Sequence, residues 1–206
     1  MIIAFSSCSY SGKSTTIDKI KKILGDRCFI VGELIREVLR KEGIESIDEV
    51  RKDTNKYFDL QVKIIHTKIN QESAYKAICT SNEIVLIDRS LADSYYYFKT
   101  YINFEKLTES KQAAYKEFEE YFLEKAKIHY QTIYDKIIIF SPIDCSKNND
   151  KMRPADLVEK QIKEYNSILE LNYNFSYMAN VRRKIIGPVN VIHDMDIILK
   201  ECTISN

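Results

Sequence analysis

Short apolar runs alternate with longer amphipathic stretches along the whole chain. Runs of four to eight apolar residues bounded by turn residues are typical of buried strands. The fourth run, Lys136–Phe140, contains three consecutive isoleucines, as expected for a strand covered on both faces. The runs that predict strands are residues 2–6, 27–31, 83–87, 136–140 and 184–191, the last interrupted by Gly187-Pro188.

The stretches between these runs have helical spacing. In the first of them Ile17, Ile20 and Leu24 lie on one side of a helix, and Gly25 ends it. Strands that alternate with helices predict right-handed crossovers and a parallel sheet. The pattern therefore predicts a three-layer α/β fold, with a mostly parallel five-stranded sheet and helices on both faces. The predicted helices span residues 13–24, 34–39, 53–80, 91–101, 108–130, 155–178 and 194–201.

Residues 7–15, SCSYSGKST, follow the first apolar run directly. A strand, a turn of small residues and Gly-Lys-Ser at the start of a helix form the phosphate-binding loop of P-loop proteins. In such a loop backbone N–H groups surround the phosphates of a nucleotide, the lysine supplies a charge and the serine helps to hold Mg²⁺. We therefore expect ATP and Mg²⁺ as cofactors, bound by Ser9, Tyr10, Ser11, Gly12, Lys13, Ser14 and Thr15.

One position departs from the usual motif. Ser7 stands where the pattern has glycine, six residues before Lys13. A small residue fits there if its φ stays negative. The alternative is a serine-rich turn in which Ser9 or Ser11 merely caps the helix. The buried strand before the turn and the helix after it favour nucleotide binding.

Charged residues follow three of the other predicted strands. In an open α/β sheet the ligand lies at the carboxyl ends of the strands. Asp88, after four apolar residues, is placed like the carboxylate that positions Mg²⁺, although it can instead cap the next helix. Arg89 suits phosphate oxygens, or can pair with Glu33. Asp93 is one helical turn further on, either functional or a solvated helix residue.

Glu33 separates two reaction types. A carboxylate there can deprotonate a hydroxyl acceptor, or it can simply favour the first turn of its helix. If the acceptor is already a phosphate no base is needed, and Arg36 becomes the more important residue. Within the aromatic run 95–98, we expect Tyr95 to contact an acceptor ring and the others to be mostly core.

The polar loop before the late helix contains KNNDKMRP, residues 147–154. We expect a lid-like segment at about 142–156 that brings Arg153 to the reacting phosphates, the alternative being a plain solvated loop. Arg182 and Arg183 are weaker candidates for the same role. His66, His129 and His193 are scattered without ligand spacing, so we expect no metal or nucleophilic role for them.

These motifs resemble the nucleoside and nucleotide kinase branch of P-loop proteins. The likeness is greatest to the small AAA-type ATPase/kinase domain of nicotinamide-riboside kinases and many phage proteins. It rests on SSCSYSGKST, GELIRE, IVLIDRSLADSYYYF and MRPAD. The resemblance implies a P-loop NTPase fold, with Asp88 and Arg89 as the acidic-arginine pair after the third strand. It also implies that Glu33 faces the acceptor and that Arg153 belongs to a lid.

The composition narrows the number of domains, the partners and the compartment that we expect. The 206 residues, with few Gly and Pro and no evident linker, favour one domain. The formal net charge is only +1, from 31 basic and 30 acidic residues, so the chain lacks the basic footprint of a non-specific duplex-binding protein. The five cysteines have no metal-ligand spacing and predict free thiols in a reducing compartment. With no run long enough to span a bilayer, we expect a cytoplasmic protein, in the host cytoplasm if viral.

Together these features predict an ATP- and Mg²⁺-dependent phosphotransferase whose acceptor is a nucleoside, nucleotide or similar molecule. Two alternatives stay open. The first is a phage-type kinase that phosphorylates a modified base such as hydroxymethyluracil, or an end, within DNA. The second is a nucleotide-dependent regulatory ATPase. The acceptor and the oligomeric state, including a homodimer, are not determined by these residues.

Overall fold

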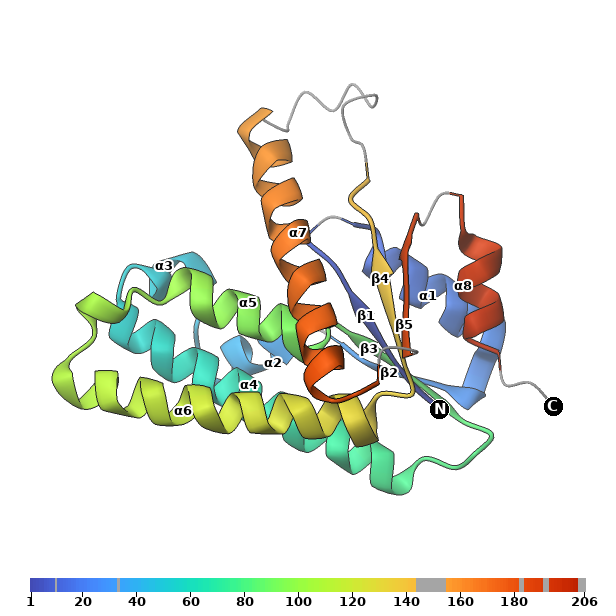
Figure 1. Ribbon diagram of the computed structural model, residues 1–206, viewed down its shortest axis with the longest axis horizontal. Helices are drawn as coiled ribbons and strands as arrows, with labels where there is room; N and C mark the ends of the chain where they lie inside the picture. The colour runs from blue at the N-terminus through green and yellow to red at the C-terminus, as the bar shows by residue number, and fades with distance from the viewer. Residues whose placement is uncertain (10, 33, 144–154, 182–183, 191–192, 204–206) are drawn as a thin grey trace.

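A five-stranded parallel sheet forms the centre of the protein, here described from a computed structural model (Figure 1). The structure describes residues 1–9, 11–32, 34–143, 155–181, 184–190 and 193–203, with only the backbone at 155–157. The strand order β2-β3-β1-β4-β5 places β1 in the middle, between β3 and β4. The strands are β1 (Ile2–Ser6), β2 (Cys28–Val31), β3 (Ile84–Asp88), β4 (Lys136–Phe140) and β5 (Ile185–Val189).

Helices cover both faces of the sheet because its central strands are apolar on both sides. In β1, Ile2 and Ala4 face the larger core, whereas Ile3 and Phe5 face the smaller one. The smaller core is closed by α1 (Lys13–Leu24) and α8 (Met195–Glu201). The larger core is closed by α4 (Thr54–Ile78), α5 (Leu91–Tyr101), α6 (Glu109–Ile128) and α7 (Ala155–Met178).

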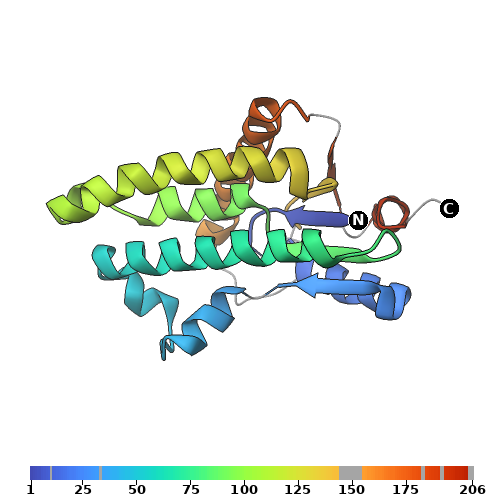
Figure 2. The ribbon, with the colours of Figure 1, turned by 90° about the horizontal axis from the view of Figure 1, so that it is seen from below.

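Three of these helices extend beyond the sheet. Figure 2 shows α4, α5 and α6 side by side, with α2 (Leu34–Lys41) and α3 (Ile47–Arg51) packed beneath α4. Aromatic rings fill the space between the long helices, for example Phe98 and Tyr115, whose centroids are 4.7 Å apart. Their stacking fixes the helices as a rigid wall beside the carboxyl ends of the strands.

The fold class, the P-loop kinase-like architecture and the parallel five-stranded sheet are as predicted from the sequence. Differences are local. Helix α3 was not predicted, because five residues are too short to show a helical period. The predicted helix 108–130 ends at Ile128 and continues as a π-helical turn, His129–Ile133. Short 3₁₀ turns lie at Gly25–Arg27 and Phe104–Lys106. Among the described residues, no helix combines the length and apolarity needed to cross a membrane.

Candidate functional site

The turn that joins β1 to α1 ends in a glycine that leads directly into the helix. Gly12 has a left-handed conformation (φ 81°, ψ 7°), which favours glycine, and it is the N-cap of α1. No side chain caps this helix end. The alternative in which Ser9 or Ser11 caps the helix is therefore wrong. The N-terminus of α1 retains the free N–H groups that attract anions.

Ser7 is accommodated where the motif has glycine. It is not among the described residues with positive φ, so glycine is not required at this position. Its hydroxyl donates to the carbonyl oxygen of Phe140 at 2.6 Å, and its N–H donates to Asp93 Oδ1 at 3.1 Å. The serine thus fastens the start of the loop to the ends of two other elements.

Asp93 is a buried anchor rather than a solvated helix residue. Its carboxylate is fully buried and accepts hydrogen bonds from the Ser6 hydroxyl at 2.5 Å and from the N–H and hydroxyl of Ser90 at 2.9 and 2.8 Å. Ser90 and Asp93 form the capping box of α5. Two alternatives are therefore wrong: Asp93 is not solvated, and Asp88 is not the cap of this helix.

Lys13 is folded over its own loop. Its ammonium group donates to the carbonyl oxygens of Ser7 at 3.0 Å and Cys8 at 2.7 Å, and to the Ser11 hydroxyl at 3.1 Å. Burial and the nearby charge of Arg89 lower the pKa of Lys13 to about 8, against the opposing effect of neighbouring carboxylates. A phosphate in the loop would give this amine the counter-ion that it lacks.

Ser14 and Asp88 form a pair that fits Mg²⁺. The Ser14 hydroxyl donates to Asp88 Oδ2 at 3.4 Å, and Asp88 Oδ1 is buried without a hydrogen-bond partner in the described residues. The same residues contain no group of three or more acidic, His or Cys side chains that could enclose a metal. Mg²⁺ beside nucleotide phosphates is held by one or two protein oxygens and completes its shell with phosphate and water. The residues present fit that arrangement.

Arg89 lies between the phosphate loop and the helical wall. It has a strained left-handed backbone (φ 76°), as is frequent at functional sites. Its guanidinium donates to the Tyr97 hydroxyl at 2.8 Å and lies 3.8 Å from Asp93 Oδ1. The predicted alternative partner, Glu33, lies outside the described residues.

A cavity of about 280 Å³ opens directly beside Ser14, Asp88 and Arg89. It joins the phosphate loop, α2, α4, the end of β3 and α5, so it brings together residues far apart in the chain. Its lining residues are Ser14, Leu34, Ile35, Arg36, Gln61, Ile64, Lys68, Asp88, Arg89, Ser94 and Tyr97. Five predicted residues of the phosphate loop and of the acceptor side thus meet in one region: Lys13, Ser14, Arg36, Asp88 and Arg89.

Gln61 and Lys68 line this cavity and were not anticipated from the sequence. Gln61 is 2% exposed, so its amide is buried in the wall of the cavity. Lys68 is buried too, and its ammonium lies 2.6 Å from Glu72 Oε1. Tyr134 donates to the other oxygen of Glu72 at 2.8 Å. Both cavity residues are polar side chains on α4, and polar residues on a long helix usually face solvent. The sequence therefore offered no signal that these two are buried.

Tyr95 is not brought into the cavity. Its hydroxyl donates to Glu119 Oε1 at 2.6 Å, and its ring packs 5.3 Å from that of Phe122 in the helical core. The tyrosine of this run that lines the cavity is Tyr97. Two residues further along a helix turn the side chain by about 200°. Tyr95 and Tyr97 therefore lie on different faces of α5, and only Tyr97 lines the cavity.

Several predicted residues cannot be placed. Tyr10, Glu33, Arg153, Arg182 and Arg183 lie outside the described residues, as does most of the predicted lid at 142–156. Of the remaining loop residues, Ser9 and Ser11 lie in the turn, whereas Thr15 is exposed on α1. Cys8 is fully buried, and burial raises the pKa of its thiol. It fills space in the loop.

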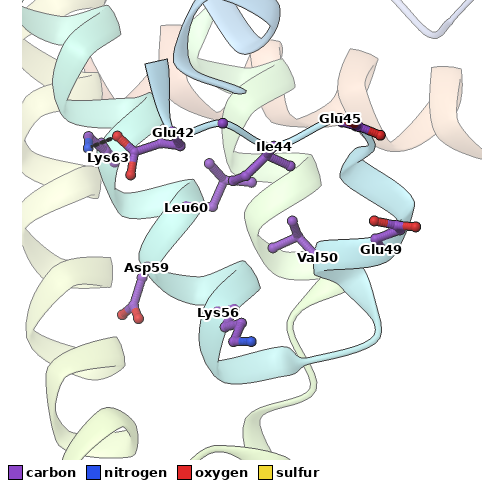
Figure 3. A pocket seen from close by; sticks show the side chains of 10 residues that line it. Glu42, Ile44, Glu45, Glu49, Val50, Lys56, Asp59, Leu60 and Lys63 are labelled. Carbon is purple, nitrogen blue, oxygen red and sulfur yellow. Dashed lines mark hydrogen bonds and ion pairs between the residues drawn. The ribbon is translucent and has the colours of Figure 1, made fainter. Parts of the chain in front are cut away.

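A second cavity, larger than the one beside Asp88, lies between α4 and the segment that precedes it. Its volume is about 750 Å³, and the segment from Glu42 to Val50 and helix α4 line it (Figure 3). Figure 3 shows Glu42 paired with Lys63 across this space. None of the residues that line it belongs to the phosphate loop or to the end of β3. Size alone therefore does not identify the reactive site.

Comparisons with solved structures find proteins of the same fold. The NadR protein in complex with NR has a TM-score of 0.64 at 14% identity, and the match covers 99% of this chain and 52% of that chain. A deoxyadenosine kinase from M. mycoides with dCMP and dCDP has a TM-score of 0.58 at 17% identity, covering 98% of both chains. The chain thus spans about half the length of NadR. At these identities the likeness establishes the fold.

A search of curated protein sequences finds no match. A family model described as an AAA domain matches residues 3–179, which include most of β1, the phosphate loop and the Asp88-Arg89 pair. The match extends over most of the chain, and it contains the strand ends where the candidate site lies. The chain therefore belongs to the AAA domain family of P-loop proteins.

Proposed function

We propose that the protein is an ATP- and Mg²⁺-dependent phosphotransferase that acts on a nucleoside, a nucleotide or a similar small molecule. The observation that carries this proposal is the position of Ser14 and Asp88. They lie 3.4 Å apart at the phosphate loop, and both line the adjoining cavity. A donor phosphate in the loop and an acceptor in the cavity would therefore meet at this pair. A nucleotide-binding loop alone would not need such a neighbouring cavity.

Each charged residue then has a role in the transfer. Lys13 and Arg89 would stabilise the moving phosphoryl group, and Ser14 and Asp88 would hold Mg²⁺. The bound metal would neutralise charge on the phosphate oxygens. Glu33 would orient or deprotonate a hydroxyl acceptor, and Arg153 would approach from the lid. Kinases gain most of their rate from positioning and electrostatics of this kind.

The cavity lining supports an acceptor with a flat apolar body and polar edges. Leu34 and Ile64 supply apolar walls, and the buried Gln61 amide has one donor side and one acceptor side. Nucleobases have that combination of surfaces. Proteins of the same fold have been solved with NR, dCMP and dCTP. A volume of about 280 Å³ also favours a free small molecule over a base within a DNA strand.

An ATP-consumption screen tests the proposal. Nucleosides, nucleoside monophosphates and DNA oligonucleotides are offered separately to the wild type, with Lys13→Ala as the inactive variant and the exposed Lys19→Ala on the same helix as its control. We expect a nucleoside or nucleotide to accelerate ATP turnover, and Lys13→Ala to abolish it. If Lys13→Ala loses nucleotide binding but no acceptor accelerates the wild type, the regulatory ATPase becomes the better interpretation. Labelled phosphate found only in oligonucleotide would indicate the DNA kinase.

A further inference from the structure

Helix α7 holds the phosphate loop through one buried carboxylate. Glu164 is 5% exposed, and its Oε1 accepts hydrogen bonds from the Ser9 N–H at 3.0 Å and from the Ser9 hydroxyl at 3.3 Å. One turn earlier, the Gln161 amide donates to the Ser9 carbonyl oxygen at 3.2 Å. Two side chains of α7 therefore fix both polar groups of the Ser9 backbone.

The same carboxylate oxygen is connected to the acceptor cavity. Tyr97 donates its hydroxyl hydrogen to Glu164 Oε1, and that hydroxyl accepts a hydrogen bond from Arg89 at 2.8 Å. The Arg89 guanidinium also lies over the Tyr97 ring, 4.9 Å from its centroid. Arg89 and Tyr97 both line the cavity. A continuous chain of contacts thus runs from the cavity through Arg89, Tyr97 and Glu164 to Ser9.

The chemistry of this chain favours one fixed arrangement. A buried carboxylate is costly unless several donors satisfy it, and here three donors converge on one oxygen. Burial and the charge of Glu164 raise the pKa of Tyr97 against the effect of Arg89, so the phenol keeps its proton and donates to Glu164. Because Tyr97 and Ser9 share the same Glu164 oxygen, a shift of the Tyr97 hydroxyl changes the hydrogen bonds that hold Ser9.

We propose that Tyr97 and Glu164 are positioning residues that couple occupancy of the acceptor cavity to the conformation of the phosphate loop. The inference rests on the proposed function in so far as the cavity is taken as the acceptor site. A ligand that packs on Arg89 and Tyr97 immobilises the chain of contacts and so preorganises Ser9 for nucleotide. By linkage, nucleotide in the loop favours the acceptor equally.

A double-mutant cycle on donor binding tests whether Tyr97 and Glu164 act on the phosphate loop as one unit, which is the part of the coupling that needs no acceptor. The dissociation constant of Mg²⁺·AMP-PNP is measured for the wild type, Tyr97→Phe, Glu164→Ala and the double variant, with thermal unfolding recorded for each. We expect each single change to weaken binding by about 5- to 10-fold, within the usual range for coupled sites. The double variant should be no weaker than Glu164→Ala, because either change breaks the same chain. Glu164→Gln, which keeps an accepting oxygen, should restore part of the affinity.

Two controls separate coupling from general damage. Tyr96→Phe removes a neighbouring hydroxyl outside the chain, and Glu170→Gln removes an exposed acid of α7. Both should bind Mg²⁺·AMP-PNP like the wild type. An unchanged affinity in Tyr97→Phe, or losses that add fully in the double variant, would overturn the coupling. A wild type that does not bind Mg²⁺·AMP-PNP would overturn both proposals. A non-additive cycle with no acceptor found in the screen would leave the coupling standing and refute only the phosphotransferase.

Discussion

The Ser7 hydroxyl donates a hydrogen bond of 2.6 Å to the carbonyl oxygen of Phe140. Ser7 follows the central strand β1, and Phe140 is the last residue of the neighbouring strand β4. Both residues are fully buried. The bond therefore ties the start of the phosphate loop to the carboxyl edge of the sheet, and it gives the serine a structural role at a position where the motif has glycine.

Restoring the glycine of the motif should destabilise this protein. Ser7→Gly removes a buried hydrogen bond and frees the unfolded backbone, and each effect is worth about 1 kcal/mol. We expect a loss of about 1–2 kcal/mol in the free energy of unfolding, measured by urea titration, with nucleotide affinity changed by only a few-fold. Ser7→Ala isolates the hydroxyl from the backbone effect. A glycine variant as stable as the wild type would show that the bond contributes nothing.

Asp88→Asn should make nucleotide binding less dependent on magnesium. The variant keeps the shape of the side chain but loses the charge that Mg²⁺ prefers. We expect Mg²⁺·ATP affinity or turnover to fall by about 10- to 100-fold, whereas metal-free ATP binds as before. Asp18→Asn, an exposed acid of α1, serves as the control in the same titrations. Equal losses with and without Mg²⁺ would contradict a metal role for Asp88.

Nucleotide affinity should fall as the pH rises through about 8. In the empty loop burial and Arg89 lower the pKa of Lys13 to about 8 from 10.5, and phosphate oxygens would raise it again. At a pH between the pKa of Lys13 in the empty loop and its higher pKa with nucleotide bound, binding takes up a proton. The affinity for nucleotide therefore decreases there by at most about tenfold per pH unit. Calorimetry in buffers of different ionisation enthalpy measures the uptake.

The lowered pKa of Lys13 affects folding stability in the opposite direction: stability rises with pH where nucleotide affinity falls. Because the folded chain loses the Lys13 proton first, the unfolded chain binds more protons between about pH 8 and 10.5, and the contribution of Lys13 to stability rises with pH there. Lys13→Arg, which stays protonated, should show neither proton uptake on nucleotide binding nor this rise. Proton uptake that persists in Lys13→Arg would assign the titration to another group.

Gln61→Leu should weaken the acceptor and spare the donor. Leucine fills similar space but cannot hydrogen-bond, so we expect the KM of the acceptor to rise about tenfold while the KM of ATP is unchanged. The free energy of unfolding should not fall, because leucine fills a similar space and avoids the cost of burying an amide. Asn70→Leu, at an exposed amide of the same helix, is the matched control. An unaltered acceptor KM would remove Gln61 from the acceptor site.

Glu33→Gln should distinguish the two kinds of acceptor. If Glu33 is the base for a hydroxyl, transfer should fall by about 10²- to 10⁴-fold while ATP affinity stays nearly the same. The control is Glu37→Gln, which changes an acid that is paired with Lys41 on α2. A normal rate in Glu33→Gln would indicate a phosphate acceptor or a purely structural glutamate. Single-turnover transfer measured beside ATP binding separates these outcomes.

The strand ends were predictable from the sequence, and so were the residues that follow them directly. Lys13 is the first residue of α1 and Asp88 is the last residue of β3, and a strand that is buried on both faces is readable as an apolar run. Helix positions were less predictable. Tyr95 and Tyr97 differ by two residues, yet only Tyr97 lines the cavity, because the rotation of α5 is set by its packing against α6 and α7.

The residues that act at a distance were not predictable at all. Glu164 lies 155 positions from Ser9 in the sequence, and Gln61 lies on a helix whose other faces are also partly polar. Neither belongs to a local motif. Both side chains are buried in the folded protein, and burial makes a polar group costly unless it finds a hydrogen-bond partner.

The sequence by itself determined the fold and the phosphate loop, because hydrophobic periodicity and loop chemistry are local properties of neighbouring residues. The tertiary structure decided which side chains share the cavity and what each of them does. Asp93 became a buried anchor, Tyr97 replaced Tyr95 at the cavity, and Glu164 reached the loop from a late helix. These outcomes depend on how helices rotate and pack against the sheet, and that packing is fixed by many contacts between residues far apart in the chain.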